Sequence, residues 1–158
     1  MKAIHIDLSA QRLELREGGR LLATYRVSTA RNGPGQERDS GCTPTGTLHI
    51  RLKIGAECPE NTVFVGRRPT GQRYTRELAA AQPHRDWILT RILWLSGDET
   101  GHNRGGRCDT LRRFIYIHGC PDAEPMGVPR SHGCIRMRNR DVVELFEQVD
   151  VRTPVLIR

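Results

Sequence analysis

The feature that most restricts the fold of this chain is a period of two in its apolar residues. The run from Leu48 to Ile54 alternates apolar with polar residues, shortly after the pair Thr45-Gly46. Because successive side chains of a strand point to opposite faces, this run predicts a half-buried strand. The same alternation over residues 4–8 and 13–15, across a short Ser-Ala-Gln break, predicts a hairpin. The chain therefore has the pattern of a mainly β protein.

Further apolar segments predict strands at 21–27, 87–95 and 114–117, where β-branched and aromatic residues are frequent. The last alternating run, 151–157, contains Pro154, which favours an edge strand or a strand start. The Gly- and Pro-rich stretch 29–46 predicts a long loop that either caps a site or is mobile.

One amphipathic helix is predicted near the C-terminus. Apolar residues fall there at i, i+3, i+4 and i+7, namely at Val142, Leu145, Phe146 and Val149. Asn139 or Asp141 is available as its N-cap. A short helical turn is also expected within residues 74–81. With 158 residues the chain fits a single domain, residues 1–158, in which one helix packs against the strands.

The formal charge of +7 favours acidic partners, such as nucleic acid, an anionic membrane or a carboxylate-rich peptide. Only 5% of the residues are aromatic, so stacking platforms for nucleic acid are not expected. No apolar run has the length of a signal peptide or a spanning helix, which predicts no membrane insertion and a cytoplasmic location. The protein would be periplasmic if a leader had been removed. Five cysteines, an odd number, suit a reducing compartment.

The segment with most chemical content, residues 114–139, reads FIYIHGCPDAEPMGVPRSHGCIRMRN. A predicted strand ends at His118, and a Gly- and Pro-rich loop returns to Cys134. An imidazole next to a thiol lowers the thiol pKa and accepts its proton, so this pair is the minimum for nucleophilic catalysis. Gly133 permits unusual backbone geometry, which would let the N–H groups of Gly133 and Cys134 point at a developing oxyanion. Cysteine usage alone does not separate this reading from a small buried hydrophobe.

The order His-Gly-x, a loop of a dozen residues, then Ser-His-Gly-Cys-Ile-Arg-x-x-Asn closely resembles the active-site signature of the L,D-transpeptidase (YkuD) family. IDLSAQRLEL resembles the opening hairpin of that family, TPTGTLHI its strand entry and DVVELFEQV its closing helix. The resemblance implies a YkuD-like β-sandwich with one C-terminal helix and short helical segments.

The resemblance also implies roles for individual residues. Cys134 would attack a carbonyl, His118 would accept its proton, and the carbonyl of Gly119 would orient the imidazole. His132, with Gly133 and Cys134, would line the oxyanion site. No cofactor and no metal is implied.

Three further residues match the family signature. Arg136 would hold a substrate carboxylate or form a structural ion pair, because an arginine fork serves either purpose. Ser131 and Asn139 look structural, although Ser131 is kept with Arg136 as a candidate substrate-binding residue.

The substrate implied by the resemblance is a peptidoglycan tetrapeptide stem or a muropeptide. The enzyme would cut between the L-centre of residue three, typically diaminopimelate, and the terminal D-alanine, through a thioester. Water would resolve the thioester in an L,D-carboxypeptidase of muropeptide recycling, which is our expectation for a cytoplasmic enzyme. An amine would instead form a 3-3 cross-link or attach D-amino acids or proteins to the wall.

Two alternatives come from other classes of protein. The pairs His118-x-Cys120 and His132-x-Cys134 offer zinc ligands, but one intervening residue is fewer than structural zinc sites use. The charge and the arginines after Cys134 leave a nucleic-acid-binding module as the other alternative. Cys120 also departs from the family, which commonly has threonine there. We expect it to pack quietly rather than to form a disulfide with Cys134.

Overall fold

The computed structural model describes residues 1–158 and is mainly β, as predicted. Its strands are β1 (Lys2–Asp7), β2 (Arg12–Glu17), β3 (Arg20–Ser28), β4 (Gly46–Ile54), β5 (Thr62–Val65), β6 (Arg68–Arg73), β7 (Leu89–Gly97), β8 (Tyr116–Gly119), β9 (Ile135–Met137) and β10 (Pro154–Ile157). Its helices are α1 (Arg76–Ala81) and α2 (Asn139–Gln148), with a 3-10 turn at Gly106–Cys108. Neither α1 nor α2 has the length and apolar composition needed to cross a bilayer.

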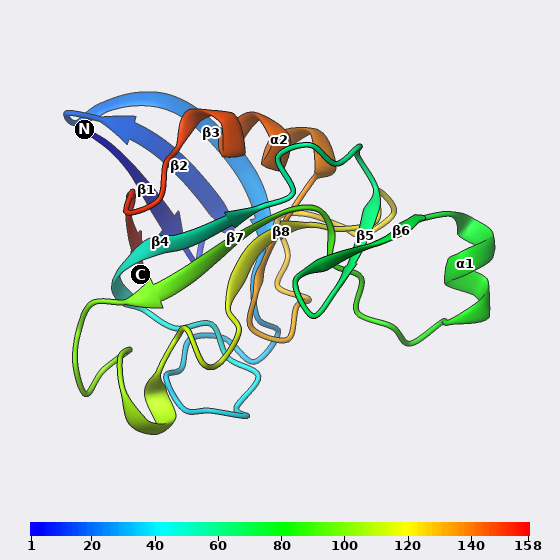
Figure 1. The fold of residues 1–158 in the computed structure, drawn as a ribbon. Coiled ribbons are helices and arrows are strands. Elements are labelled where there is room, and N and C mark those ends of the chain that lie inside the picture. Colours follow the sequence, from blue (N-terminus) through cyan, green and yellow to red (C-terminus); the bar gives the residue numbers. More distant parts are fainter.

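The strands form one sheet in the order β4-β10-β1-β2-β3-β9-β8-β7-β5-β6. Because β7 also pairs with β4, the sheet closes on itself and encloses a core. Helix α2 lies along this sheet in Figure 1, and its apolar stripe faces the interior. The main cluster of 20 buried residues joins alternate positions of the strands to that stripe, for example Ile4, Ile6, Leu13, Leu15, Ile117, Val142 and Leu145. The period of two in the strands and the i, i+3, i+4 spacing in the helix thus meet in one core.

Most of the predicted elements are confirmed. The opening hairpin is β1–β2, the strand at 48–54 lies in β4, and the apolar run 87–95 contains most of β7. The helical turn expected within 74–81 is α1, capped by the hydroxyl of Thr75. The loop 29–46 contains no strand before Gly46.

Two details of the predictions are wrong, and one alternative is decided. Of the two readings of Pro154, the strand start is confirmed, since Pro154 begins β10, and the edge strand is not, since β10 lies between β4 and β1. The N-cap of α2 is Arg138, since Asn139 is already helical and its side chain is turned into the protein. The strand predicted from Phe114 begins only at Tyr116, because Phe114 has a φ of 57°, outside the range of a strand.

The connection from β4 to β7 holds β5, β6 and α1, and Figure 1 shows it projecting to one side of the closed sheet. The β5–β6 hairpin and the short strand β9 were not predicted. Strand β8 pairs in parallel with β9 and antiparallel with β7. This arrangement sets the His-Gly dipeptide of β8 next to the segment that follows Cys134.

Candidate active site

His118 lies on β8 with its ring almost fully buried. Its Nδ1 is 2.6 Å from the carbonyl oxygen of Gly119. Since a carbonyl only accepts hydrogen bonds, Nδ1 carries the proton, and in the neutral ring Nε2 is the basic nitrogen. Nε2 has no hydrogen-bond partner. The residues that were predicted as base and orienter are therefore in contact, with the second nitrogen free for chemistry.

Gly119 is held in a space too small for any side chain. A Cβ at this position would lie 2.4 Å from Oδ1 of Asn139 and 2.7 Å from the carbonyl oxygen of Leu89. Asn139 in turn donates from Nδ2 to the carbonyl of Cys120 at 2.9 Å and accepts at Oδ1 from the Thr90 hydroxyl at 2.6 Å. Asn139 is thus structural, as expected, and it fixes the backbone that orients the imidazole.

Burial is the main influence on the pKa of His118, and it lowers that pKa from its usual value. The nearby carboxylate of Asp86 and the carbonyl of Gly119 oppose this effect without cancelling it. The imidazole is therefore neutral at neutral pH, which is the protonation state that a general base requires.

Cys134 is half-buried immediately before β9. Its sulfur accepts a hydrogen bond from the backbone N–H of Tyr116 and donates one to the carbonyl of Phe114, both at 3.3 Å. Burial raises the pKa of the thiol to about 12. The resting side chain is therefore a neutral thiol hydrogen-bonded to the backbone of residues 114–116, and it makes no hydrogen bond to His118.

The loop before Cys134 is braced from within and from outside. The Ser131 hydroxyl donates to the carbonyl of Cys134 at 2.6 Å and accepts from the N–H of Gly133 at 3.2 Å. Thr43, from the long loop 29–46, donates from its hydroxyl to the carbonyl of Gly133 at 2.9 Å. Gly133 has a φ of 135°, where a Cβ would meet the carbonyl of Cys42 at 3.2 Å. These contacts give Ser131 a bracing position, and they tie the long loop to the site.

The N–H groups that were predicted to bind an oxyanion differ in availability. The N–H of Gly133 is committed to Ser131, whereas that of Cys134 has no partner within the protein. The imidazole of His132 is 77% exposed and lies 3.5 Å from the carboxylate of Asp86. The resting loop therefore offers the Cys134 N–H as its free donor.

Asp86 is a site residue that the sequence did not reveal. It precedes β7, and its carboxylate lies 2.8 Å from Nη2 of Arg136 and 3.5 Å from Nδ1 of His132. Burial acts to raise the pKa of Asp86, but His118 and Arg136 hold it below its usual value. No motif marks Asp86, because only the return of the β5–β6–α1 excursion brings it to the site.

Arg136 has the contacts of an ion-paired residue. Its side chain is 8% exposed, and its second carboxylate neighbour is Glu124 at 3.6 Å. Of the two readings of Arg136, the structural ion pair thus accounts for the resting contacts. A substrate carboxylate would therefore have to compete with Asp86 for the guanidinium of Arg136.

Two small hollows flank the catalytic loop, and His132 lines both. One, of about 230 Å³, is lined by Arg38, Asp39, Gly41, Arg112, Arg113, Phe114, Ile115 and His132. The other, of about 250 Å³, is lined by Arg31, Pro83, His84, Arg85, Asp86, Glu124, Arg130, His132 and Arg136. Both are rich in arginine, so both favour anionic groups.

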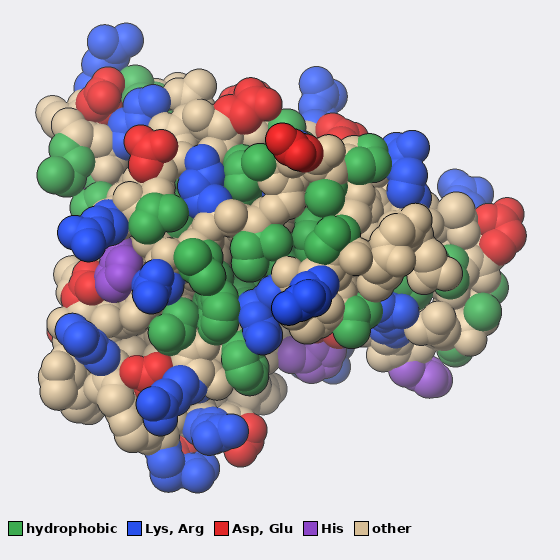
Figure 2. Space-filling model, viewed as in Figure 1, with side chains coloured by type: hydrophobic (Ala, Val, Ile, Leu, Met, Phe, Trp, Pro, Cys, Tyr) green, Lys and Arg blue, Asp and Glu red, His purple; other side chains and the backbone are tan.

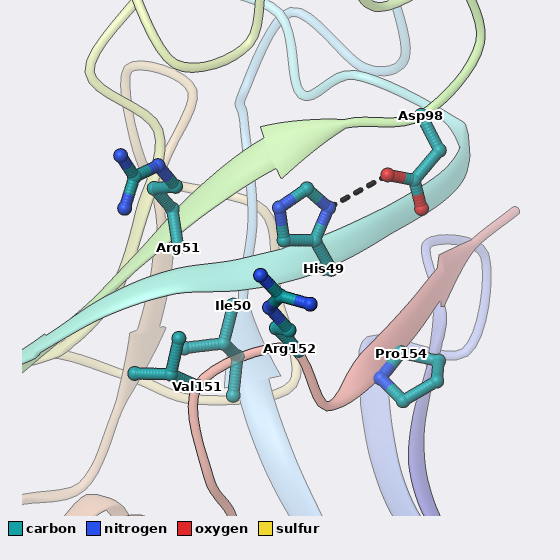
Figure 3. A pocket seen from close by; sticks show the side chains of 7 residues that line it. All are labelled: His49, Ile50, Arg51, Asp98, Val151, Arg152 and Pro154. Atoms are coloured by element: carbon teal, nitrogen blue, oxygen red, sulfur yellow. Dashed lines mark hydrogen bonds and ion pairs between the residues drawn. The ribbon is translucent and has the colours of Figure 1, made fainter.

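A larger hollow of about 600 Å³ lies elsewhere, beside β4 and the connection from α2 to β10. In Figure 3 its wall carries a His49–Asp98 pair, with Nδ1 and Oδ1 2.6 Å apart, close to Arg152. It is lined by no cysteine, serine or threonine. It is therefore a poor candidate for thiol or hydroxyl acyl transfer.

The side chains that suggested a zinc site lie in different environments, since Cys120 is buried and His132 is exposed. Cys120 is buried, its thiol donates to the carbonyl of Met137 at 3.4 Å, and burial raises its pKa to about 12. His132 is exposed and faces Asp86. No cluster that could hold a metal ion forms from these residues. Cys120 packs quietly, as expected, and all five cysteines are free thiols.

Known proteins resemble this chain in sequence and in fold. The sequence model of the YkuD family, described as the L,D-transpeptidase catalytic domain, matches residues 1–157. The chain is 41% identical over 64 residues to "Putative L,D-transpeptidase YqjB" of Bacillus subtilis, a segment that spans 40% of this chain and 32% of that relative.

Solved structures show the same fold. The catalytic domain of the Enterococcus faecium L,D-transpeptidase superposes with a TM-score of 0.57 at 18% identity, covering 100% of this chain and 97% of that one. The L,D-transpeptidase LdtMt1 in complex with imipenem gives a TM-score of 0.58 at 19% identity, covering 99% of this chain and 58% of that one. At this identity the superpositions establish the fold alone. Together with the match along residues 1–157, they show that the chain belongs to the YkuD family of L,D-transpeptidase catalytic domains.

Proposed function

We propose that this protein is a cysteine acyl-transferase of peptidoglycan stem tetrapeptides, with Cys134 as nucleophile and His118 as general base. The observation that carries the proposal is the fixed tautomer of His118. Because Nδ1 is bound to the Gly119 carbonyl, Nε2 is the available base, and β8 pairs with the strand that directly follows Cys134, whose backbone N–H is unpartnered.

In the proposed reaction the Cys134 thiol rotates away from the Phe114 carbonyl and gives its proton to Nε2 of His118. The sulfur attacks the carbonyl carbon of residue three, and a C–S bond forms. The N–H of Cys134 donates to the oxyanion. When the intermediate collapses, the C–N bond to D-alanine breaks and His118 returns the proton to the departing amine. Because thiol and imidazole are both neutral at rest, proton transfer accompanies the attack instead of preceding it.

The second half-reaction depends on the acyl acceptor. We infer that water is the main acceptor, so that the enzyme acts as an L,D-carboxypeptidase that releases a tripeptide. Five free thiols support a reducing compartment, where soluble stem peptides are met in place of polymerised wall. An amine acceptor would instead give a 3-3 cross-link through the same thioester.

Incubation with free tetrapeptide, followed by mass spectrometry, tests the acceptor. Tripeptide and D-alanine as main products are expected. Dimer as the main product would overturn the carboxypeptidase assignment and leave the acyl-enzyme intact.

A carbapenem tests the nucleophile independently, since a structural relative was solved with imipenem. Intact-protein mass should rise by one carbapenem adduct in the wild type and in Cys108→Ala, a variant of a thiol outside the site. The adduct should be absent in Cys134→Ala. In His118→Ala it should form at least about 100-fold more slowly, as expected for loss of a general base. An adduct in Cys134→Ala would refute the assignment.

A further inference from the structure

Arg67 occupies an unusual backbone position at the end of the β5–β6 hairpin. Gly66 and Arg67 have φ values of 55° and 64°, the combination found in two-residue type I′ turns. Glycine or asparagine is the ordinary residue in such a conformation, and a long side chain there carries a backbone cost. Strain of this kind is concentrated at functional sites.

The guanidinium of Arg67 lies on a platform of three aromatic side chains. Its carbon is 4.8 Å from the ring centroid of Trp94 and 5.0 Å from that of Phe114. Nη1 donates to the hydroxyl of Tyr116 at 3.2 Å. The rings support one another, with centroids 6.1 Å apart for Trp94 and Phe114 and 5.9 Å apart for Trp94 and Tyr116.

This guanidinium has no anionic partner. No carboxylate lies within ion-pair distance of Arg67, and four of its five N–H donors are unused in the structure. The side chain is nevertheless half-buried by the rings. A half-buried, stacked and unpaired arginine is prepared to bind a planar anion through its fork.

The platform adjoins the proposed nucleophile. Phe114 and Tyr116 provide the backbone groups that hydrogen-bond to the sulfur of Cys134. Cys134 and Trp94 both pack against the small buried cluster that contains Tyr116. Phe114 remains 49% exposed, in a positive-φ conformation that few large residues adopt. Figure 2 shows hydrophobic side chains gathered at the centre of this face, next to Lys or Arg side chains over the end of the β5–β6 hairpin.

We propose that Arg67, with Trp94, Phe114 and Tyr116, forms a subsite that binds a carboxylate of the donor peptide. This inference rests on the function proposed above, and it makes Arg67 a specificity-determining residue. The stem peptide has two carboxylates near the cleaved bond, on the side chain of residue three and on the terminal D-alanine. Either one satisfies the chemistry of the subsite, since both are planar anions on a chain that reaches Cys134.

The test compares three donors with four proteins. The first donor carries both carboxylates. The second has an amidated residue-three side chain, and the third ends in D-alaninamide. The proteins are the wild type, Arg67→Ala, Arg67→Lys and the control Arg68→Ala, in which the neighbouring exposed arginine lacks any ring or carboxylate contact. Release of the C-terminal residue gives kcat/KM.

For Arg67→Ala we expect kcat/KM to fall about 10- to 100-fold on the full donor, the size of a lost charge-assisted contact. The loss should shrink to less than about threefold on the one donor that lacks the recognised carboxylate, and this identifies which carboxylate binds. Arg67→Lys should recover part of the loss, and Arg68→Ala should match the wild type.

Equal losses for Arg67→Ala on all three donors, or no loss at all, would overturn the subsite. The proposed function would still stand if the wild type turned the donors over. A wild type that releases nothing from any donor and takes up no carbapenem would refute the function itself. Melting temperatures of both arginine variants separate recognition from a merely structural contact of the hairpin.

Discussion

At the scale of single residues, the candidate site depends on a backbone glycine as much as on its reactive side chains. The carbonyl of Gly119 holds the imidazole of His118, and the absence of a side chain at Gly119 leaves room for Asn139. Asn139 is buried with its amide fully engaged, also by Asn61 at 3.0 Å. A substitution that disturbs these contacts would therefore displace the imidazole of His118 without directly altering Cys134.

The change Gly119→Ala should destabilise the fold by about 1–3 kcal/mol, because the new methyl group overlaps Asn139 and the Leu89 carbonyl. Thermal unfolding measures this loss, and the carbapenem acylation rate measures the displacement of His118. Gly18→Ala is the matched control. Gly18 has a φ of 56° with open space around it, so that variant reports backbone strain alone. Equal effects of the two changes on acylation would contradict the argument.

The pH dependence of kcat/KM should follow His118 and not the thiol. Burial lowers the pKa of His118, so the base is lost only as the pH falls through a value below the ordinary 6.5 or so. Burial raises the pKa of Cys134 to about 12, so no alkaline limb from the thiol is expected between pH 7 and roughly pH 9. Iodoacetamide alkylation of Cys134 should rise with pH without a plateau near neutrality.

Asp86→Asn offers a further check of this profile. The carboxylate raises the pKa of His118, so its removal should move the acid limb to lower pH. A limb that moves upward, or a thiolate present at pH 7, would contradict the neutral pair.

At the scale of elements, the long loop 29–46 is a brace of the catalytic loop. The Thr43 hydroxyl accepts from the N–H of Ala30 at 3.0 Å and donates to the carbonyl of Gly133. Thr43 is buried, and its two hydrogen bonds link the end of β3 to the segment that precedes Cys134. The sequence predicted a loop at residues 29–46, but it did not reveal that Thr43 holds the loop against Gly133.

Thr43→Val keeps the shape of the side chain and removes both hydrogen bonds. Two buried backbone groups lose their partner, so unfolding should become about 1–3 kcal/mol easier, measured by denaturant titration. Acylation should also slow, because the loop of Gly133 loses its outer anchor. Thr24→Val, at an exposed position of β3, should change neither property. A Thr43 variant with wild-type stability would show that the brace is dispensable.

At the scale of the whole molecule, closure of the sheet gathers distant segments around the thiol. The two hollows beside His132 draw arginines from the loop 29–46, from the approach to β7, from residues 112–113 and from the catalytic loop itself. With a net charge of +7, the field at the site attracts anionic peptides over a distance of about the Debye length.

Raising the ionic strength from about 0.01 M to 1 M should therefore raise KM for an anionic stem peptide and leave kcat nearly unchanged. Initial rates at several salt concentrations measure the effect. A donor with amidated carboxylates serves as the control and should respond weakly. An equal response of both donors would show that long-range charge does not guide the substrate.

Features that repeat over short distances were readable from the sequence. The period of two identified β1, β2 and β4, and the helical spacing identified α2, because both patterns report one buried face of a regular element. The β5–β6 hairpin escaped notice, because the residues of β6 are all exposed and carry no alternation.

The sequence by itself determined the family, the mainly β architecture and the candidate Cys134–His118 pair, since these follow from local periodicity and from the spacing of one continuous motif. Only the tertiary structure decided that Asp86 joins the site, that the N–H of Gly133 is already engaged and that Arg67 is stacked on Trp94 without an ion-pair partner. The physical reason is that these contacts join segments far apart in the chain. Their partners are chosen by the closure of the sheet, which leaves no periodic trace in the residues themselves.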